Sequence, residues 1–205
     1  MENRNELFRA IPIFASDLTD KELSDFSVRY NAGQGLVQYL YGFAEKDEAD
    51  NVMRTYIVRD KKTNELVGYF SLKAGMISVN ETKNGDRDKF DTMPGVELAN
   101  FAVNDTYIRK HKALKGCGRI IFDLLIVPTI EEVARKIGIK LIYIFALPID
   151  SLIERYRDYG FKRLPSKQED ELHKRLNRIM TNPVSSCIRN YKYQTKMIKI
   201  THHPI

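Results

Sequence analysis

The sequence predicts an α/β (α+β) fold: a single domain over residues 1–205 in which helices flank a mixed, mostly antiparallel, twisted sheet. Three observations lead to this prediction. Strand-like and helical patterns alternate along the chain. The run from Ile139 to Leu147 is almost wholly apolar, as is typical of a strand covered on both faces. The stretch from Glu97 to Arg119 has the pattern of a strand, a basic connection and a glycine turn that opens a helix.

Composition narrows the class of protein. Hydrophobic residues make up 43% of the 205 positions and charged residues 29%, as in an ordinary globular domain. We expect no membrane span and no signal peptide, because no apolar run is long enough. A cytoplasmic location is expected from the cysteine usage. Two cysteines, Cys117 and Cys187, predict no disulfide framework, and the four histidines lack zinc-ligand spacing, so no metal site is expected. A net charge of +6 favours an anionic partner: nucleic acid, a phosphorylated cofactor or an acidic protein.

In the first half of the chain we expect an N-terminal helical part over residues 17–45 and the start of a core that spans residues 55–164. Residues 6–16 contain a candidate strand. The box Thr19-Asp20-Lys21-Glu22 predicts a helix N-terminus, with the helix running to about Tyr30. Further elements are a helix near residues 36–43, a hairpin of strands 55–59 and 66–72, and a mobile surface loop over residues 79–93.

In the second half, the apolar periodicity from Ile120 to Ile137 predicts a helix that Pro128 kinks and Gly138 ends. The buried strand 139–147 is followed by a helix from Ser151 to Tyr159, which Gly160 ends, and by a strand over residues 161–164. Residues 166–200 are expected to add a charged helix (166–182) and a closing strand (186–200).

The segment Gly116-Cys117-Gly118-Arg119 carries the chemical signal. A helix N-terminus offers unpaired N–H groups and the positive end of a dipole, and glycine lets a ligand approach the backbone closely. The segment therefore suits an anionic ligand, and Glu97 on the adjoining strand suggests proton chemistry. A tight strand-to-helix turn packed for its own sake is an equally common reading of these residues.

Together three features resemble the GNAT-fold N-acetyltransferases over about residues 55–164. The first is the strand ELANFAV with its carboxylate at Glu97. The second is the turn KGCGR before a helix. The third is LIYIFAL followed by SLIERYRDYGF, in which Tyr156 stands four residues before Gly160-Phe161.

The resemblance implies acetyl-CoA as the acyl donor. Its pantetheine would pair with the strand backbone of Phe101, Ala102 and Val103. Its pyrophosphate would lie on the turn and its basic neighbours: Lys112, Lys115, Gly116, Cys117, Gly118 and Arg119. Tyr156 takes the position of the general acid, and Glu97 that of the general base, acting directly or through water.

Other readings stay open for these residues. Tyr156 could be a core aromatic, and the basic residues from Arg109 to Arg119 could be a solvated face. Cys117 is best explained as a small residue of the turn, because no base stands near it in sequence. Two departures from the family concern the cofactor contacts: Ala113 replaces its Gln or Arg, and the connection 104–115 is longer than usual.

The order of segments is similar to the GNAT branch of aminoacyl-tRNA-acetylating toxins. That likeness implies an amine-bearing acceptor (a small molecule, a peptide or a charged tRNA), an antitoxin as partner, and leaves a homodimer open. The competing class is a GNAT-like module that binds CoA or nucleic acid without catalysis, the latter through the basic segment 107–119. Ala113 favours that class, whereas the pair Glu97 and Tyr156 favours the enzyme.

Overall fold

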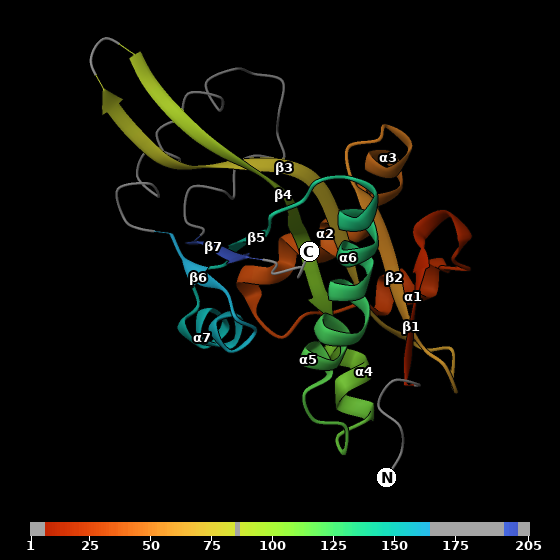
Figure 1. Cartoon of the computed structure of the whole chain (residues 1–205). Coiled ribbons are helices and arrows are strands. Elements are labelled where there is room, and N and C mark those ends of the chain that lie inside the picture. The colour runs from red at the N-terminus through yellow and green to blue at the C-terminus, as the bar shows by residue number, and fades with distance from the viewer. Residues whose placement is uncertain (1–6, 85–86, 165–194, 201–205) are drawn as a thin grey trace. The chain divides into compact units, whose positions relative to one another are not determined.

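The computed structural model describes residues 7–84, 87–164 and 195–200 (Figure 1). The chain forms two compact units. The first contains Met1–Ala74 and Leu98–Ile137, and the second contains Gly75–Glu97 and Gly138–Ile205. Each unit combines strands with helices, so the predicted mixed α/β class is confirmed. No helix in the described ranges is long and apolar enough to cross a membrane.

The strands of the first unit follow the order β1-β2-β3-β4. They are β1 (Phe8–Pro12), β2 (Arg54–Asp60), β3 (Leu66–Asn84) and β4 (Arg87–Val103), of which β3 and β4 continue into the second unit. Strand β1 pairs antiparallel with β2, and β2 pairs antiparallel with β3. The hairpin predicted for β2 and β3 is therefore confirmed.

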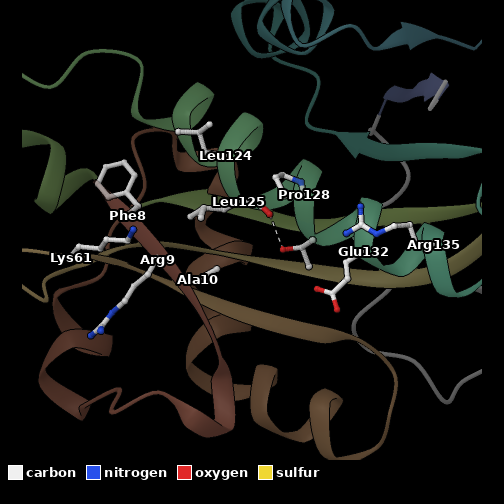
Figure 2. A pocket seen from close by; sticks show the side chains of 10 residues that line it. Phe8, Arg9, Ala10, Lys61, Leu124, Leu125, Pro128, Glu132 and Arg135 are labelled. Atoms are coloured by element: carbon white, nitrogen blue, oxygen red, sulfur yellow. Dashed lines mark hydrogen bonds between the residues drawn. The ribbon is translucent and has the colours of Figure 1, made fainter. Parts of the chain in front are cut away.

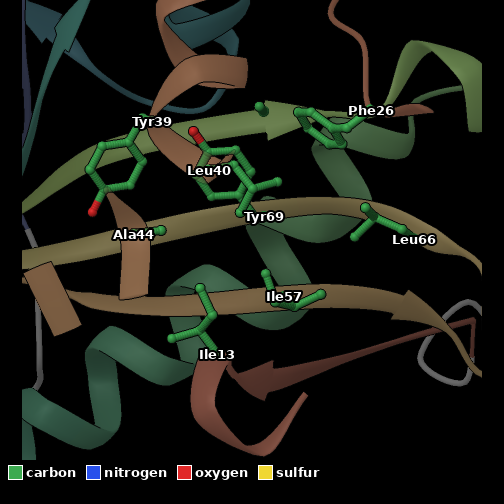
Figure 3. Close-up of a cluster of buried hydrophobic side chains, with 9 residues drawn as sticks. Ile13, Phe26, Tyr39, Leu40, Ala44, Ile57, Leu66 and Tyr69 are labelled. Atoms are coloured by element: carbon green, nitrogen blue, oxygen red, sulfur yellow. The ribbon is translucent and has the colours of Figure 1, made fainter. Parts of the chain in front are cut away.

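The N-terminal helices cover one face of these strands. They are α1 (Asp20–Asp25), α2 (Gln34–Gly42) and α3 (Ala44–Ala49), with short 3₁₀ turns at Ile13–Ala15 and Asn31–Gly33. Figure 3 shows Tyr39 and Leu40 of α2 packed toward Tyr69 of β3 and Ile57 of β2. The Tyr39 and Tyr69 rings stack with 6.3 Å between centroids, and the Tyr69 hydroxyl donates to the Leu36 carbonyl at 2.7 Å.

Helix α1 begins as predicted and ends early. Thr19 caps it, its hydroxyl accepting from the Glu22 amide at 3.3 Å while the Glu22 carboxylate accepts from the Thr19 amide at 3.0 Å. The helix stops at Asp25 rather than near Tyr30, because Phe26 takes an extended conformation and buries its ring beside Tyr69.

A second helical layer follows β4. It comprises α4 (Asp105–Lys110), α5 (Cys117–Ile121), a π-helical turn (Phe122–Ile126) and α6 (Val127–Lys136), and Figure 1 shows α6 and α2 on opposite sides of the strands. The helix predicted from Ile120 begins three residues earlier, at Cys117. Instead of a sharp kink, the π turn precedes Pro128, which cannot donate an N–H to the preceding turn.

The second unit contains the strand order β4-β5-β7-β6. Strand β5 (Leu141–Ala146) pairs parallel with β4 over Gly95–Glu97 and antiparallel with β7 (Thr195–Ile200), and β7 pairs with β6 (Lys162–Arg163). Helix α7 (Asp150–Asp158) precedes β6, and Gly160 has a φ of 87°, as the predicted helix end requires. The predicted strand over residues 139–147, the helix that follows it and the short strand after that helix are confirmed.

One prediction is wrong. Residues 79–93 are not a surface loop, because β3 extends to Asn84 and β4 starts at Arg87 (Figure 1). The prediction followed the polar composition, but an antiparallel strand need not be made of apolar residues. The basic connection 104–115 is helical over α4. The helix predicted over residues 166–182 lies outside the described residues, as does the closing strand before Thr195.

Candidate active site

The predicted site residues fall into two groups, one in each unit. The first unit holds the residues predicted to bind the cofactor: Phe101, Ala102, Val103, Lys112, Lys115, Gly116, Cys117, Gly118 and Arg119. The second unit holds the two predicted catalytic residues, Glu97 and Tyr156. Each group is described within its own unit.

The glycine turn has the geometry that the sequence predicts. Gly116 is exposed, adopts φ 75° and ψ 23°, and precedes α5 as its cap residue. Its carbonyl accepts from the Ile120 amide at 3.0 Å, so the helix starts here. Apart from its two chain neighbours, no described residue has a heavy atom within 4 Å of the position that a Gly116 side chain would take. The first amides of α5 therefore follow an open left-handed turn, where helix N–H groups lack intrahelical acceptors.

The basic residues around this turn differ in whether an acidic side chain pairs with them. Arg109 pairs with Asp105 at 3.3 Å, and Lys110 pairs with Glu65 at 3.2 Å. His111 Nε2 lies 2.7 Å from Glu65, and Arg119 pairs with Asp123.

Lys112 and Lys115 differ from those four. Both are exposed, and neither has an ion-pair partner among the described residues. They are thus the cations of this loop whose charge the neighbouring acids leave available to a ligand.

Asn104 fixes the end of β4, a role that sequence reasoning missed. Its amide donates to the Val67 carbonyl at 2.8 Å, and its side-chain amide donates to Leu66 at 2.9 Å. Its side-chain oxygen accepts from the Thr106 amide at 3.1 Å, which caps α4. The Asn-Asp-Thr sequence after a strand is an N-cap signal that could have predicted this helix. The contacts hold Phe101–Val103, where Ala102 is buried and its two neighbours are half-buried.

Cys117 is a buried residue of the turn. Its side chain is 4% exposed, and burial raises the pKa of its thiol to about 12. A thiol with that pKa is protonated at neutral pH, and the thiolate is the nucleophilic form. The geometry therefore supports the interpretation of Cys117 as a small packing residue.

Tyr156 lies on the inner side of α7 and is 5% exposed. Its ring meets Tyr159 and Phe161 edge to face, with centroids 6.0 and 5.7 Å away. Burial raises the pKa of the phenol well above its usual value of 10, with a further contribution from Tyr159. The residue is thus a protonated phenol at neutral pH. It is both a core aromatic and a group able to donate a proton.

Glu97 is a buried carboxyl residue, 7% exposed, on β4. It stands opposite Tyr143 of β5 and is the last residue of β4 that pairs with β5 in the described register. Opposed residues of neighbouring strands project to the same face of a sheet, so Tyr143 and Glu97 share a face. The Tyr143 hydroxyl lies against Gly75, where an added Cβ would be only 1.9 Å from it.

A groove of about 500 Å³ lies in the first unit, and none of the predicted site residues lines it. We call it the β1 groove. Figure 2 shows residues of β1 on one side of it and residues of the π turn and α6 on the other. Its lining residues are Phe8, Arg9, Ala10, Lys61, Leu124, Leu125, Pro128, Thr129, Glu132 and Arg135.

No protein-family model matches the chain. Solved structures do. One described as a bacterial toxin has a TM-score of 0.61 and 15% identity, covering 98% of this chain and 99% of that chain. AtaTR bound with AcCoA has a TM-score of 0.56 and 15% identity, and the match covers 95% of this chain and 94% of that chain. AtaT complexed with acetyl-methionyl-tRNAfMet has a TM-score of 0.57 and 16% identity, and the match covers 77% of this chain and 88% of that chain. A mutant form of the toxin KacT also matches. The chain therefore has the GNAT fold of the AtaT and KacT toxins.

Proposed function

We propose that this protein is an N-acetyltransferase that transfers an acetyl group from acetyl-CoA to a primary amine. The observation that carries the proposal is the likeness of fold along nearly the whole chain to AtaTR, whose structure was solved with AcCoA bound. A second, local observation supports it: the open left-handed turn at Gly116 before α5. Neither depends on the other, and both agree with the sequence motifs.

The residues of the first unit fit acetyl-CoA. Lys112 and Lys115 would bind its phosphates, because their charges have no partner in the described part of the chain. The first amides of α5, at Cys117, Gly118 and Arg119, would donate to the pyrophosphate at the positive end of the helix dipole. The β4 backbone at Phe101–Val103 would pair with the pantetheine. Ala113 is exposed and contributes no polar contact, so Lys112 substitutes for the missing family residue.

The catalytic roles belong to the second unit. Acetyl-CoA supplies a thioester, which is an activated acyl group. Glu97 accepts a proton from the incoming ammonium, directly or through water, so that the amine becomes a nucleophile. Tyr156 donates its hydroxyl proton to the departing sulfur.

We propose an aminoacyl-tRNA as the acceptor. AtaT has been solved with acetyl-methionyl-tRNAfMet, which is an N-acetylated aminoacyl-tRNA. The net charge of +6 favours a polyanionic substrate. AtaT has also been solved with the C-terminus of its antitoxin AtaR, and an antitoxin is accordingly proposed as a partner of this chain. The homodimer left open by the sequence stays a prediction.

The test is an acetylation assay on the purified protein. Acetyl-CoA is offered with charged tRNA, uncharged tRNA, a polyamine or a peptide amine, and released thiol is measured. We expect thiol release with charged tRNA and none with uncharged tRNA, since only the former has the α-amino group. Thiol release with only the polyamine or the peptide would support the proposed acetyltransferase activity and contradict the proposed tRNA acceptor. Acetyl-CoA binding without release for any acceptor would favour the non-catalytic module.

A further inference from the structure

We propose that the β1 groove and the free edge of β1 form a docking site for an extended, acidic segment of a partner protein, which adds to the sheet as a further strand. The proposal does not depend on the proposed enzymatic function, because none of the residues assigned to acetyl transfer lines this groove. It rests on the hydrogen-bonding edge of β1, on the apolar wall opposite and on the charges at the rim.

The edge of β1 that faces away from β2 has no strand partner among the described residues. In the strand order β1 is the terminal strand, paired only with β2 among the described residues. The Lys61 amide donates to the Leu7 carbonyl at 2.9 Å, just before the register that opposes Arg9 to Arg59. Antiparallel hydrogen bonds recur at every second residue. Phe8 and Ala10 therefore direct their N–H and C=O groups away from β2, and both residues line the groove.

The opposite wall is apolar and fixed. It consists of Leu124 and Leu125 from the π turn and Pro128 from α6 (Figure 2). The Thr129 hydroxyl donates to the Leu125 carbonyl at 2.7 Å, which holds this turn in place. A strand bound along β1 would place alternate side chains against this wall, since successive residues of a strand point to opposite faces.

The rim of the groove is basic. Lys61 and Arg135 are exposed without an ion-pair partner among the described residues. The Arg9 side chain points away from Leu124 and Leu125 (Figure 2) and donates to Asn64 at 2.7 Å. The one acid, Glu132, pairs with Lys136 at 2.8 Å. Carboxylates on the bound segment would therefore find two cations, Lys61 and Arg135.

The same charges argue against a second copy of this chain. Two β1 strands paired through a twofold axis would bring like charges together, which opposes association. An acidic segment from another protein is the occupant that fits both the charge and the edge.

The test uses the full chain and a labelled synthetic peptide of about eight residues, a typical strand length, that alternates valine with glutamate. One control peptide is N-methylated on every residue and cannot donate to a strand edge from either side; another replaces glutamate with lysine. Fluorescence anisotropy should show binding of the first peptide only. Hydrogen exchange should show new protection of the Phe8 and Ala10 amides, with unchanged protection elsewhere in β1.

Two variants sharpen the test. Ala10→Pro removes an outward N–H and leaves the β2 pairing intact, because proline is tolerated where the N–H faces away from the sheet. Arg135→Glu reverses a rim charge. Each should weaken peptide binding about tenfold, as expected when one hydrogen bond or one charge contact is lost. Lys46→Glu on α3, which does not line the groove, is the matched control and should bind normally.

Three results would overturn the proposal: no binding of the valine–glutamate peptide at millimolar concentration, equal binding of the N-methylated peptide, or no protection of Phe8 and Ala10. Displacement of the peptide by a phosphate polymer of equal charge at equal concentration would also overturn it. That outcome would show that the groove recognises negative charge alone, which a nucleic acid would also supply.

Discussion

The carboxylate of Glu22 accepts hydrogen bonds from both terminal nitrogens of Arg59, at 2.5 and 3.1 Å, although Arg59 is a buried residue of β2. The same carboxylate completes the N-terminal cap of α1. Arg59 also donates to the carbonyls of Asn64 and Asp17. One side chain thus joins the first helix to the sheet and neutralises an otherwise buried cation.

Glu22→Gln should destabilise the first unit. Breaking a buried ion pair leaves an uncompensated charge, and the cost is about 2–3 kcal/mol because Glu22 itself is partly exposed. Urea denaturation followed by circular dichroism measures it. Glu132→Gln, which removes an exposed pair with Lys136, is the control and should change the midpoint little. Equal effects of the two substitutions would mean that Arg59 does not depend on Glu22.

The same pair predicts a pH dependence of stability. The hydrogen bond from Arg59 holds the pKa of Glu22 below its usual value of 4.5. Because the folded-state pKa is lowered, the stabilisation is complete above about pH 4.5 and is lost as pH falls through the folded value. The free energy of unfolding should therefore drop in mild acid for the wild type. The drop should be smaller in Glu22→Gln, and identical profiles would contradict the assignment.

Tyr156→Phe should reduce turnover about a hundredfold or more while leaving acetyl-CoA affinity similar, because general acid catalysis typically contributes at least that much. Steady-state kinetics and calorimetry measure the two quantities. Tyr159→Phe is the matched control: it is also a buried tyrosine of this region and lies edge to face with Tyr156. A similar loss of turnover in both variants would assign Tyr156 to packing rather than to proton transfer.

Lys112→Ala and Lys115→Ala should each weaken acetyl-CoA binding several-fold and flatten its dependence on salt, because each removes an available cation from a polyanion site. Isothermal titration at two salt concentrations gives both numbers. Arg109→Ala is the comparison, since Asp105 already pairs with that cation. Unchanged acetyl-CoA binding in both lysine variants would contradict the assignment of the phosphate site to Lys112 and Lys115.

The fold was largely predictable because its signals are local. The capping box at Thr19, the glycine at Gly160 and the apolar run of β5 each act through their own neighbours. The tertiary contacts of Glu65 and Asn104 were not predictable from the sequence. Glu65 contacts His111, 46 residues away, and Asn104 contacts residues 38 and 77 positions away along the chain. The ribbon of β3 and β4 was missed because its sequence lacks the regular apolar alternation by which a strand is recognised.

For the candidate site, the sequence predicted the turn at Gly116 correctly. It could not show which of the basic residues near the turn are paired with acidic residues. Only the fold shows that Glu65 and Asp123 neutralise their neighbours and that Lys112 and Lys115 stay available. The assignments of Glu97 and Tyr156 stay predictions, because burial alone does not separate a catalytic group from a core residue.

The most direct measurement is calorimetric titration of the purified protein with acetyl-CoA, followed by thiol release with charged tRNA as acceptor. We predict micromolar binding, with thiol release that requires the free α-amino group of the charged tRNA. Absence of acetyl-CoA binding would contradict the proposed function at its root.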